Sequence, residues 1–228
     1  MPQNSEKPSA APKRKLSKRG AETERKFLDA ANEVFWANGF AGSKISQIVE
    51  AEDLSVGSFY HLFADKSELL ERATDRLLRD FRKTYQGMDL SRDTNGDVFT
   101  MLYRLTLTGR LLISRHRGIY RATAELAQND FSGFGPMQTI APAVVDAVRD
   151  VLPDYADQLP QTPNPADIAY AVQLITMSAL QTELGMGPHF PTDLRAFAQV
   201  IARAACGVLH YSGQTDRPNV GQDEDTGT

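Results

Sequence analysis

The spacing of apolar residues is the feature that most limits what this chain can fold into. Apolar side chains recur at intervals of three and four residues, and strict alternation at every second residue is nearly absent. Intervals of three and four place side chains on one face of an α-helix, whereas a half-buried strand needs a period of two. With 228 residues, the chain is long enough to bury a substantial core. We therefore predict an all-α protein.

The composition excludes several classes of protein. Hydrophobic residues make up 41% of the chain and charged residues 24%, which is typical of globular domains and not of wholly disordered chains. No apolar run approaches the length of about 18 residues that spans a bilayer, and the N-terminus lacks the apolar segment of a secretory signal. The single Cys206 cannot form an intramolecular disulfide. We expect a cytoplasmic protein with no membrane partner.

Positive charge is concentrated near the N-terminus. The net charge of −4 argues against a protein that coats polyanions through general basicity. Residues 1–20 nevertheless hold six basic residues and one acidic residue, in a segment that contains Pro and Ser and has no apolar period. We predict a basic disordered arm over 1–20, compatible with an arm that becomes ordered on DNA, and an acidic disordered tail over 213–228.

Residues that start and stop helices divide the chain between 23 and 211. A first helix is predicted over 23–38, because Gly39 is placed as a C-terminal stop. A long helix over 65–85 begins at Asp65, with Glu68 three residues later as in a capping box. Turn residues separate it from further helices over 98–114, from there to about 128, and over 137–152, 166–184 and 193–211, with a proline-rich linker over 153–165.

Two predicted helices, over 45–51 and 56–63, are too short to be stable alone. The turn between them, from Glu52 to Ser55, has the length that sets two helices at a steep angle in a helix-turn-helix unit. A core shared with the first helix would hold them in place. Its expected members are Phe27, Val34, Phe35, Phe40, Ile45, Ile48, Ala51, Leu54, Phe59 and Phe63.

The second short helix has an outward face without a carboxylate. An ordinary solvated face carries Glu and Lys, whereas a helix that enters the major groove must avoid negative charge near the phosphates. Side chains and N–H groups at its N-terminus then meet base edges and phosphates. The alternative is three packed helices with an incidental face of small residues. We favour a recognition helix whose outward residues are Ser55, Val56, Gly57, Ser58, Tyr60 and His61.

A series of short motifs follows in order between Thr23 and Leu70. The motifs are Gly39-Phe40-Ala41-Gly42-Ser43, Ile45-Ser46-Gln47-Ile48, Leu54-Ser55-Val56-Gly57-Ser58-Phe59-Tyr60-His61-Leu62-Phe63 and Asp65-Lys66-Ser67-Glu68-Leu69. This segment resembles the DNA-binding domain of TetR-type transcriptional regulators. The resemblance implies an N-terminal three-helix helix-turn-helix domain over 21–66. A long helix would join it to an α-helical effector-binding and dimerisation domain over 67–212.

The resemblance also implies contacts with an operator in double-stranded DNA. Ser43 matches a small hydroxyl residue that touches the DNA backbone. Tyr60, His61 and Lys66 match positions that contact phosphates. The positions where the family meets bases or nearby phosphates are here Lys44, Ser46, Gln47, Ser55, Val56, Gly57 and Ser58.

Three residues depart from the pattern of the family. Asp53 replaces the usual glycine of the turn, Val49 replaces an alanine, and Glu52 replaces a small residue. Asp adopts left-handed backbone conformations more readily than most residues, so we expect the turn to form with Asp53 in it.

The last two predicted helices carry apolar residues on two faces. A helix that is apolar on two faces is buried on two sides. We interpret the second side as a homodimer contact, as the resemblance also implies, with a wholly internal helix pair as the alternative. In the helix over 166–184 one stripe is Ile168, Ala171, Val172, Ile175 and Ala179, and the other is Tyr170, Leu174, Met177, Leu180 and Leu184. The last helix has Leu194, Phe197, Ile201, Ala204 and Val208 on one face and Val200 on another.

The middle helices contain candidates for a small-molecule effector site, although each is alternatively a core residue. Arg110 stands among leucines, so its charge either extends outward to water or binds an anion. The candidates are Tyr103, Thr106, Arg110, Tyr120, Phe131, Phe134 and Met177.

Together these patterns predict a ligand-responsive transcriptional regulator, a repressor, that binds a pseudo-palindromic operator as a homodimer and is released by an effector. The effector would tilt the long helix that begins at Asp65 and so change the spacing of the two recognition helices. The alternatives are an activator, an effector-independent DNA-binding dimer and an enzyme with an unrecognised site. Common catalytic motifs and metal-ligand spacings are absent, and Cys206 lies on an apolar helix, so we expect no catalytic residue, metal or cofactor.

Overall fold

The computed structural model describes residues 17–127, 135–185, 193–216 and 218, and within these ranges the chain is helical without any strand. The all-α fold is therefore confirmed. The helices in chain order are α1 (Lys18–Gly42), α2 (Ile45–Glu50), α3 (Val56–Leu62), α4 (Lys66–Gln86), α5 (Arg92–Asn95), α6 (Val98–Arg115), α7 (Arg117–Leu126), α8 (Gly135–Val151), α9 (Pro165–Leu184) and α10 (Leu194–Val208).

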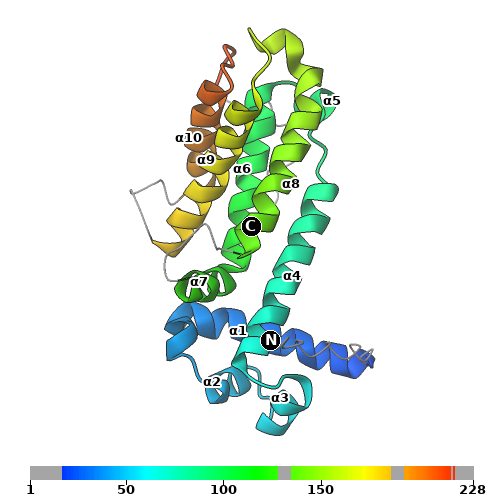
Figure 1. The fold of residues 1–228 in the computed structure, drawn as a ribbon, viewed down its shortest axis with the longest axis vertical. Coiled ribbons are helices and arrows are strands. Elements are labelled where there is room, and N and C mark those ends of the chain that lie inside the picture. Colours follow the sequence, from blue (N-terminus) through cyan, green and yellow to red (C-terminus); the bar gives the residue numbers. More distant parts are fainter. Residues whose placement is uncertain (1–16, 128–134, 186–192, 217, 219–228) are drawn as a thin grey trace, which may run out of the picture.

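Figure 1 shows a small group of helices at the foot of the molecule and a larger bundle above it. The small group is α1, α2 and α3, and the bundle contains α6, α8, α9 and α10. The long helix α4 runs from the small group up the side of the bundle, and α7 lies across the base of the bundle beside α1. Among the described helices, α1 and α7 make the most extensive contact with each other.

Polar side chains start the helices where the sequence places them. The Asp65 carboxylate accepts hydrogen bonds from the backbone N–H groups of Ser67 (2.8 Å) and Glu68 (2.9 Å), which begins α4. The Glu68 carboxylate reaches back to the N–H of Ala64 (2.8 Å), one residue earlier than a capping box requires. These bonds satisfy N–H groups that have no partner inside the helix.

The first helix is longer than predicted at both ends. It begins at Lys18, where the Ser17 hydroxyl accepts from the N–H of Gly20, so residues 18–20 are helical and not part of an arm. The apolar period misses this start because the first turns are largely exposed to solvent. The rest of the predicted arm lies outside the described residues. The chain leaves the helical conformation at the predicted stop, Gly39 (φ 71°), and then makes one more turn to Gly42.

Two segments predicted as irregular contain short helices. The predicted linker over 153–165 begins as a 3-10 helix, Leu152–Gln158, in which Pro153 occupies the first turn, where its missing N–H costs nothing. Tyr155 in this helix is buried and donates its hydroxyl to the carbonyl of Leu90 (2.8 Å). The segment over 87–96 contains α5. Local proline and glycine signals therefore mark these breaks correctly but miss the structure that packing induces in them.

The start of the predicted acidic tail is attached to α10. The side-chain amide of Gln199 donates to the carbonyl of Asp216 (2.5 Å), and the Arg203 guanidinium lies 3.6 Å from the Asp216 carboxylate. The rest of the tail, apart from residue 218, lies outside the described residues.

The predicted core of the small group is present with one exception. Phe27 meets Phe59 and Phe63 edge-on, with ring centroids 5.5 and 5.7 Å apart. Phe27, Val34, Phe35, Ile48, Phe59 and Phe63 are buried, and Phe40, Ile45 and Leu54 pack against them partly buried. Ala51, at the C-terminal cap of α2, is exposed.

No helix of the described chain is both long and apolar enough to span a membrane.

Candidate nucleic-acid interface

Helix α3 presents an uncharged, partly apolar outer face. Its sequence, Val-Gly-Ser-Phe-Tyr-His-Leu, contains no acidic residue. Phe59 and Leu62 are buried beneath it, and as a consequence Val56 and Tyr60 point outward, 50% and 57% exposed. Thymine methyl groups and the sugar–phosphate backbone are surfaces that fit a face of this kind.

The N-terminus of α3 is built to approach another molecule closely. The Ser55 hydroxyl caps the helix by accepting from the N–H of Ser58 (3.0 Å), and the two serine hydroxyl oxygens are 2.8 Å apart. Gly57 is exposed, and the nearest atom to a Cβ placed there is the Ser55 Oγ at 3.9 Å. The backbone here is therefore open on the outer side.

Helix α2 contributes exposed polar groups beside α3. Lys44 and Ser46 are exposed. The side-chain oxygen of Gln47 accepts from the N–H of Lys44 (2.8 Å) and so caps α2. His61, at the last turn of α3, is also exposed.

Two further predicted contact residues, Ser43 and Lys66, also have internal partners. Ser43 is 5% exposed and donates its hydroxyl to the carbonyl of Phe40 (2.7 Å). The Lys66 ammonium donates to the carbonyls of Ser43 (2.7 Å) and Phe40 and lies 4.5 Å from the centre of the Phe40 ring. Lys66 therefore does not project as a phosphate contact would. It holds the turn between α1 and α2.

The turn between α2 and α3 forms with its unusual residues in place. Asp53 has φ of 50°, the left-handed conformation expected where the family has glycine. The Glu52 carboxylate lies 3.9 Å from the ammonium of Lys26 on α1, and Val49 is buried in the core. The three departures therefore leave the geometry of the helix-turn-helix unit intact.

The turn after Gly39 is also held from the bundle, by a residue that sequence reasoning missed. The Glu125 carboxylate on α7 accepts from the backbone N–H of Phe40 (2.7 Å) and of Ala41 (2.9 Å). Glu125 and Phe40 are 85 positions apart, and no local signal predicts such a pair. Only the packing of α7 on α1 brings them together.

Close backbone packing holds α7 against α1. A Cβ at Gly118 would lie 1.7 Å from the carbonyl oxygen of Asn32, so only glycine fits at this crossing. The Asn32 side chain on α1 accepts from the N–H of Gly118 on α7 (3.1 Å) and donates to the carbonyl of Arg115, the last residue of α6 (3.2 Å). The Arg121 guanidinium donates to the carbonyl of Trp36 on α1.

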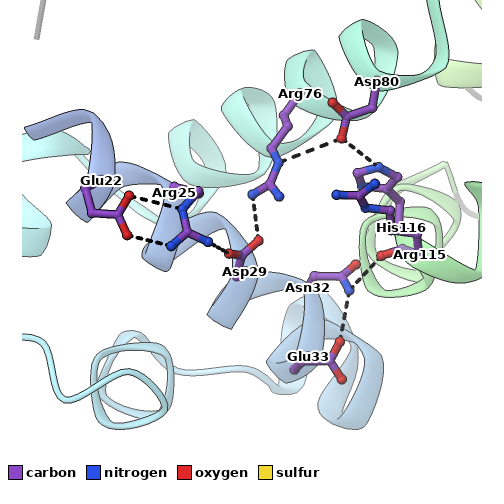
Figure 2. A network of polar contacts seen from close by, with 9 residues as sticks. All are labelled: Glu22, Arg25, Asp29, Asn32, Glu33, Arg76, Asp80, Arg115 and His116. Atoms are coloured by element: carbon purple, nitrogen blue, oxygen red, sulfur yellow. Dashed lines mark hydrogen bonds and ion pairs between the residues drawn. The ribbon is translucent and has the colours of Figure 1, made fainter. Parts of the chain in front are cut away.

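Helix α4 is joined to its neighbours by a chain of charged groups (Figure 2). The Arg76 guanidinium lies 2.7 Å from the Asp29 carboxylate on α1 and 3.9 Å from Asp80. Asp80 in turn lies 3.2 Å from Nε2 of His116, at the junction of α6 and α7. Burial lowers the pKa of His116, and Arg76 and Arg115 lower it further, while Asp80 acts in the opposite direction.

The predicted effector residues do not form one cluster around a described cavity. Tyr103, Thr106 and Tyr120 are buried, and the Thr106 hydroxyl donates to the carbonyl of Leu102 within its own helix. We predicted that the charge of Arg110 either extends to water or binds an anion. In the structure its guanidinium pairs with the largely buried carboxylate of Glu183. Met177 is half-buried beside a cavity between α8 and α9. Phe131 and Phe134 lie outside the described residues.

Cys206 is 1% exposed, and burial raises the pKa of its thiol to about 12. Cys206 therefore lies in the core, where burial keeps its thiol protonated at neutral pH. In the part of the chain that the structure describes, no three His, Cys, Asp or Glu side chains are grouped as metal ligands would be.

The fold and the exposed face of α3 define a helical protein with a helix-turn-helix unit. The family model "Bacterial regulatory proteins, tetR family" matches residues 27–73. Residues 27–73 therefore resemble the N-terminal domain of this family. No curated protein matches the sequence.

Solved structures share the fold well beyond the matched segment. A tetR-family regulatory protein from Rhodococcus RHA1 is 19% identical, with a TM-score of 0.63 over 87% of this chain and all of that one. Reduced NemR from E. coli is 16% identical, with a TM-score of 0.57 over 85% and 100% of the two chains. A gamma-butyrolactone receptor, described as ArpA-like, is 18% identical, with a TM-score of 0.54 over 84% and 87%.

Proposed function

We propose that this protein is a homodimeric, ligand-responsive repressor that binds a pseudo-palindromic operator through α3 and is released by a small molecule. The observation that carries the proposal is the outer face of α3, where Val56 and Tyr60 are exposed and no carboxylate is present. Lys44, Ser46, Gln47, Ser55, Gly57, Ser58 and His61 surround them as further proposed contacts, while Ser43 and Lys66 support the turn from inside.

The outer faces of α9 and α10 support a dimer. The predicted inner stripe of α9, from Ile168 to Ala179, is buried within the chain. Tyr170 on α9 and Val200 on α10 are 62% and 44% exposed. Leu174 and Met177 are only partly covered. A wholly internal helix pair would not leave these groups exposed, and a second copy of the chain packed across the two helices would bury them.

A cavity between α4 and α8 supports an effector site. Its volume is about 350 Å³, within the range of small-molecule sites. The lining is mainly apolar, with Arg82 and Gln86 as its long polar side chains, so we propose a small organic effector with a large apolar part. Because α4 begins beside the turn at Ser43, a ligand that separates α4 from α8 would also move the helix-turn-helix unit. The lining residues are Leu78, Phe81, Arg82, Tyr85, Gln86, Thr139, Ile140, Ala143 and Ala147.

Selection of bound duplexes from a random pool, followed by binding titrations at several salt concentrations, tests the proposal. We expect a preferred duplex with two related half-sites about one helical turn apart, bound by two chains. Replacing Tyr60 by Ala should weaken binding to all duplexes, and Ser58→Ala should change the preference among them. Leu111→Ala is a matched control, because Leu111 is 52% exposed but lies on α6, away from α3.

The titrations also separate the alternatives. A monomer with no preference for any duplex would disprove the proposal. A preferred duplex that no compound releases would instead favour an effector-independent DNA-binding dimer. A screen of small apolar compounds against the preformed complex distinguishes these two results.

A further inference from the structure

The turn after Gly39 connects the end of α1 to α2 and is held from two sides. On one side the Lys66 ammonium donates to the carbonyls of Phe40 and Ser43. On the other side the Glu125 carboxylate accepts from the N–H groups of Phe40 and Ala41. A cation therefore binds the carbonyls and an anion binds the amides, each with the charge that suits the backbone dipoles it meets.

The backbone is shaped to receive the carboxylate of Glu125. Gly39 has φ of 71° and ψ of 178°, so the helix is broken there and the next two N–H groups begin a new turn. A Cβ at Gly39 would lie 2.5 Å from the nearer oxygen of Glu125, so the glycine also makes room for the carboxylate. Glu125 thus acts as an N-terminal cap supplied by a different helix.

Glu125 belongs to α7, whose position relative to α1 is fixed by backbone contact. Gly118, about two turns earlier on α7, packs against the backbone of Asn32 and Trp36. The Arg121 guanidinium, between these two points, bonds to the carbonyl of Trp36. A displacement of α7 would therefore carry α1 with it and would also reach the turn before α2 directly, through Glu125.

From this geometry we infer that Glu125 is a positioning residue for DNA recognition: by holding the amides of Phe40 and Ala41, it sets the orientation of α2 and α3 from the bundle. The inference rests on the proposed function and deepens it, because it names the contact through which a change in the bundle reaches the DNA-binding face. Glu125 itself is not a DNA contact. Its carboxylate would repel phosphates if it faced them.

Because of this repulsion, the two possible roles of Glu125 predict opposite changes in DNA affinity when its charge is removed. Removing an acidic charge from a DNA-binding protein strengthens binding if the charge acts only through long-range electrostatics. Loss of a positioning contact has the opposite effect on the specific duplex. The variants are Glu125→Gln, which keeps one acceptor oxygen, and Glu125→Ala, which keeps none. The matched control is Glu71→Gln, which removes the same charge from an exposed residue of α4.

Three measurements are made on the full chain: hydrogen exchange of the Phe40 and Ala41 amides, melting temperature, and affinity for the selected and a scrambled duplex. We expect faster exchange of both amides and about tenfold weaker binding of the selected duplex in Glu125→Ala, a change typical of coupling between sites. Glu125→Gln should show a smaller loss. Binding of the scrambled duplex should stay the same or strengthen slightly, as in Glu71→Gln.

The outcomes are distinguishable. A purely stabilising role would lower the melting temperature but leave the ratio of the two affinities unchanged, and this result would overturn the inference. Tighter binding of both duplexes by the Glu125 variants would also overturn it. If Glu125→Ala does not fold, the ratio measured for Glu125→Gln decides. A parent protein that does not discriminate between the duplexes would overturn the proposed function itself, and the inference with it.

Discussion

Helix α1 is attached to α7 and to α4 by two different kinds of contact. Against α7 the backbones touch, because Gly118 leaves no side chain between the helices and Asn32 bonds across the crossing. Against α4 the helices are joined by long charged side chains, Arg72 to Glu24 (2.6 Å) and Arg76 to Asp29 (2.7 Å).

The two contacts differ in how much movement they allow. Close backbone packing has essentially one geometry, because interiors are packed as densely as crystals and do not deform continuously. An Arg–carboxylate pair that is partly exposed can follow a sliding helix by changing rotamers at little cost in free energy. We therefore expect α1 and α7 to move as one body, while α4 is able to shift along α1.

The largest effect should come from breaking the rigid contact. In Gly118→Ala the new methyl group would collide with the carbonyl of Asn32, and overpacking of this kind costs about 3 kcal/mol of unfolding free energy. The measurement is chemical denaturation followed by circular dichroism. Gly207→Ala is the control, because no atom lies within 4 Å of a Cβ there, and it should stabilise α10 by about 0.5–1 kcal/mol. Equal stability of the two variants would show that the crossing is not rigid.

An intermediate effect is expected from removing the cation that holds the turn on the α4 side. Lys66→Met keeps the length of the side chain but leaves the Ser43 carbonyl without its donor, while the Phe40 carbonyl still accepts from the Ser43 hydroxyl. An unsatisfied, partly buried carbonyl costs about 1–3 kcal/mol, measurable in the same denaturation experiment. Lys83→Met, in the last turn of α4, removes the same charge from an exposed site. If both variants lose the same small amount, Lys66 does not hold the turn.

The smallest effect should be a pH dependence that originates at the adjustable contact. The pKa of His116 is lowered in the folded protein, whereas in the unfolded chain it has its ordinary value of about 6.5. Below that value the unfolded state binds a proton that the folded state does not, so the free energy of unfolding falls as pH decreases. This part of the pH dependence should disappear in His116→Gln.

Two further variants sharpen the pH experiment. His210→Gln, at a partly exposed site on the surface, should leave the His116 contribution in place. In Arg76→Gln the pKa of His116 should rise, because one of the charges that lowers it is gone. Titration of the histidine ring signals by NMR measures this shift directly. A His116 pKa that does not respond to Arg76→Gln would mean that the two groups are not close in solution.

Local sequence signals predicted much of the small group of helices. The cap at Asp65, the stop at Gly39 and the left-handed Asp53 all depend on residues within a few positions of each other, and all three are present. The start of α1 was predicted too late because its first turns are polar on all sides and have no apolar period to read. The short helix at Leu152–Gln158 was missed because Tyr155, buried against Leu90, holds it in place.

The sequence by itself determined the helical class, the helix boundaries to within a few residues and the acid-free face of α3, because each follows from the order of neighbouring residues. Tertiary structure alone decided the partners of Lys66, Arg110 and Glu125. Lys66 matches a phosphate-contacting position by resemblance, yet its ammonium has carbonyl partners 23 and 26 positions away. The Arg110 guanidinium pairs with the Glu183 carboxylate, and the Glu125 carboxylate accepts hydrogen bonds from the amides of Phe40 and Ala41. A charged side chain binds the partner that the fold brings within reach, and sequence spacing does not encode that distance.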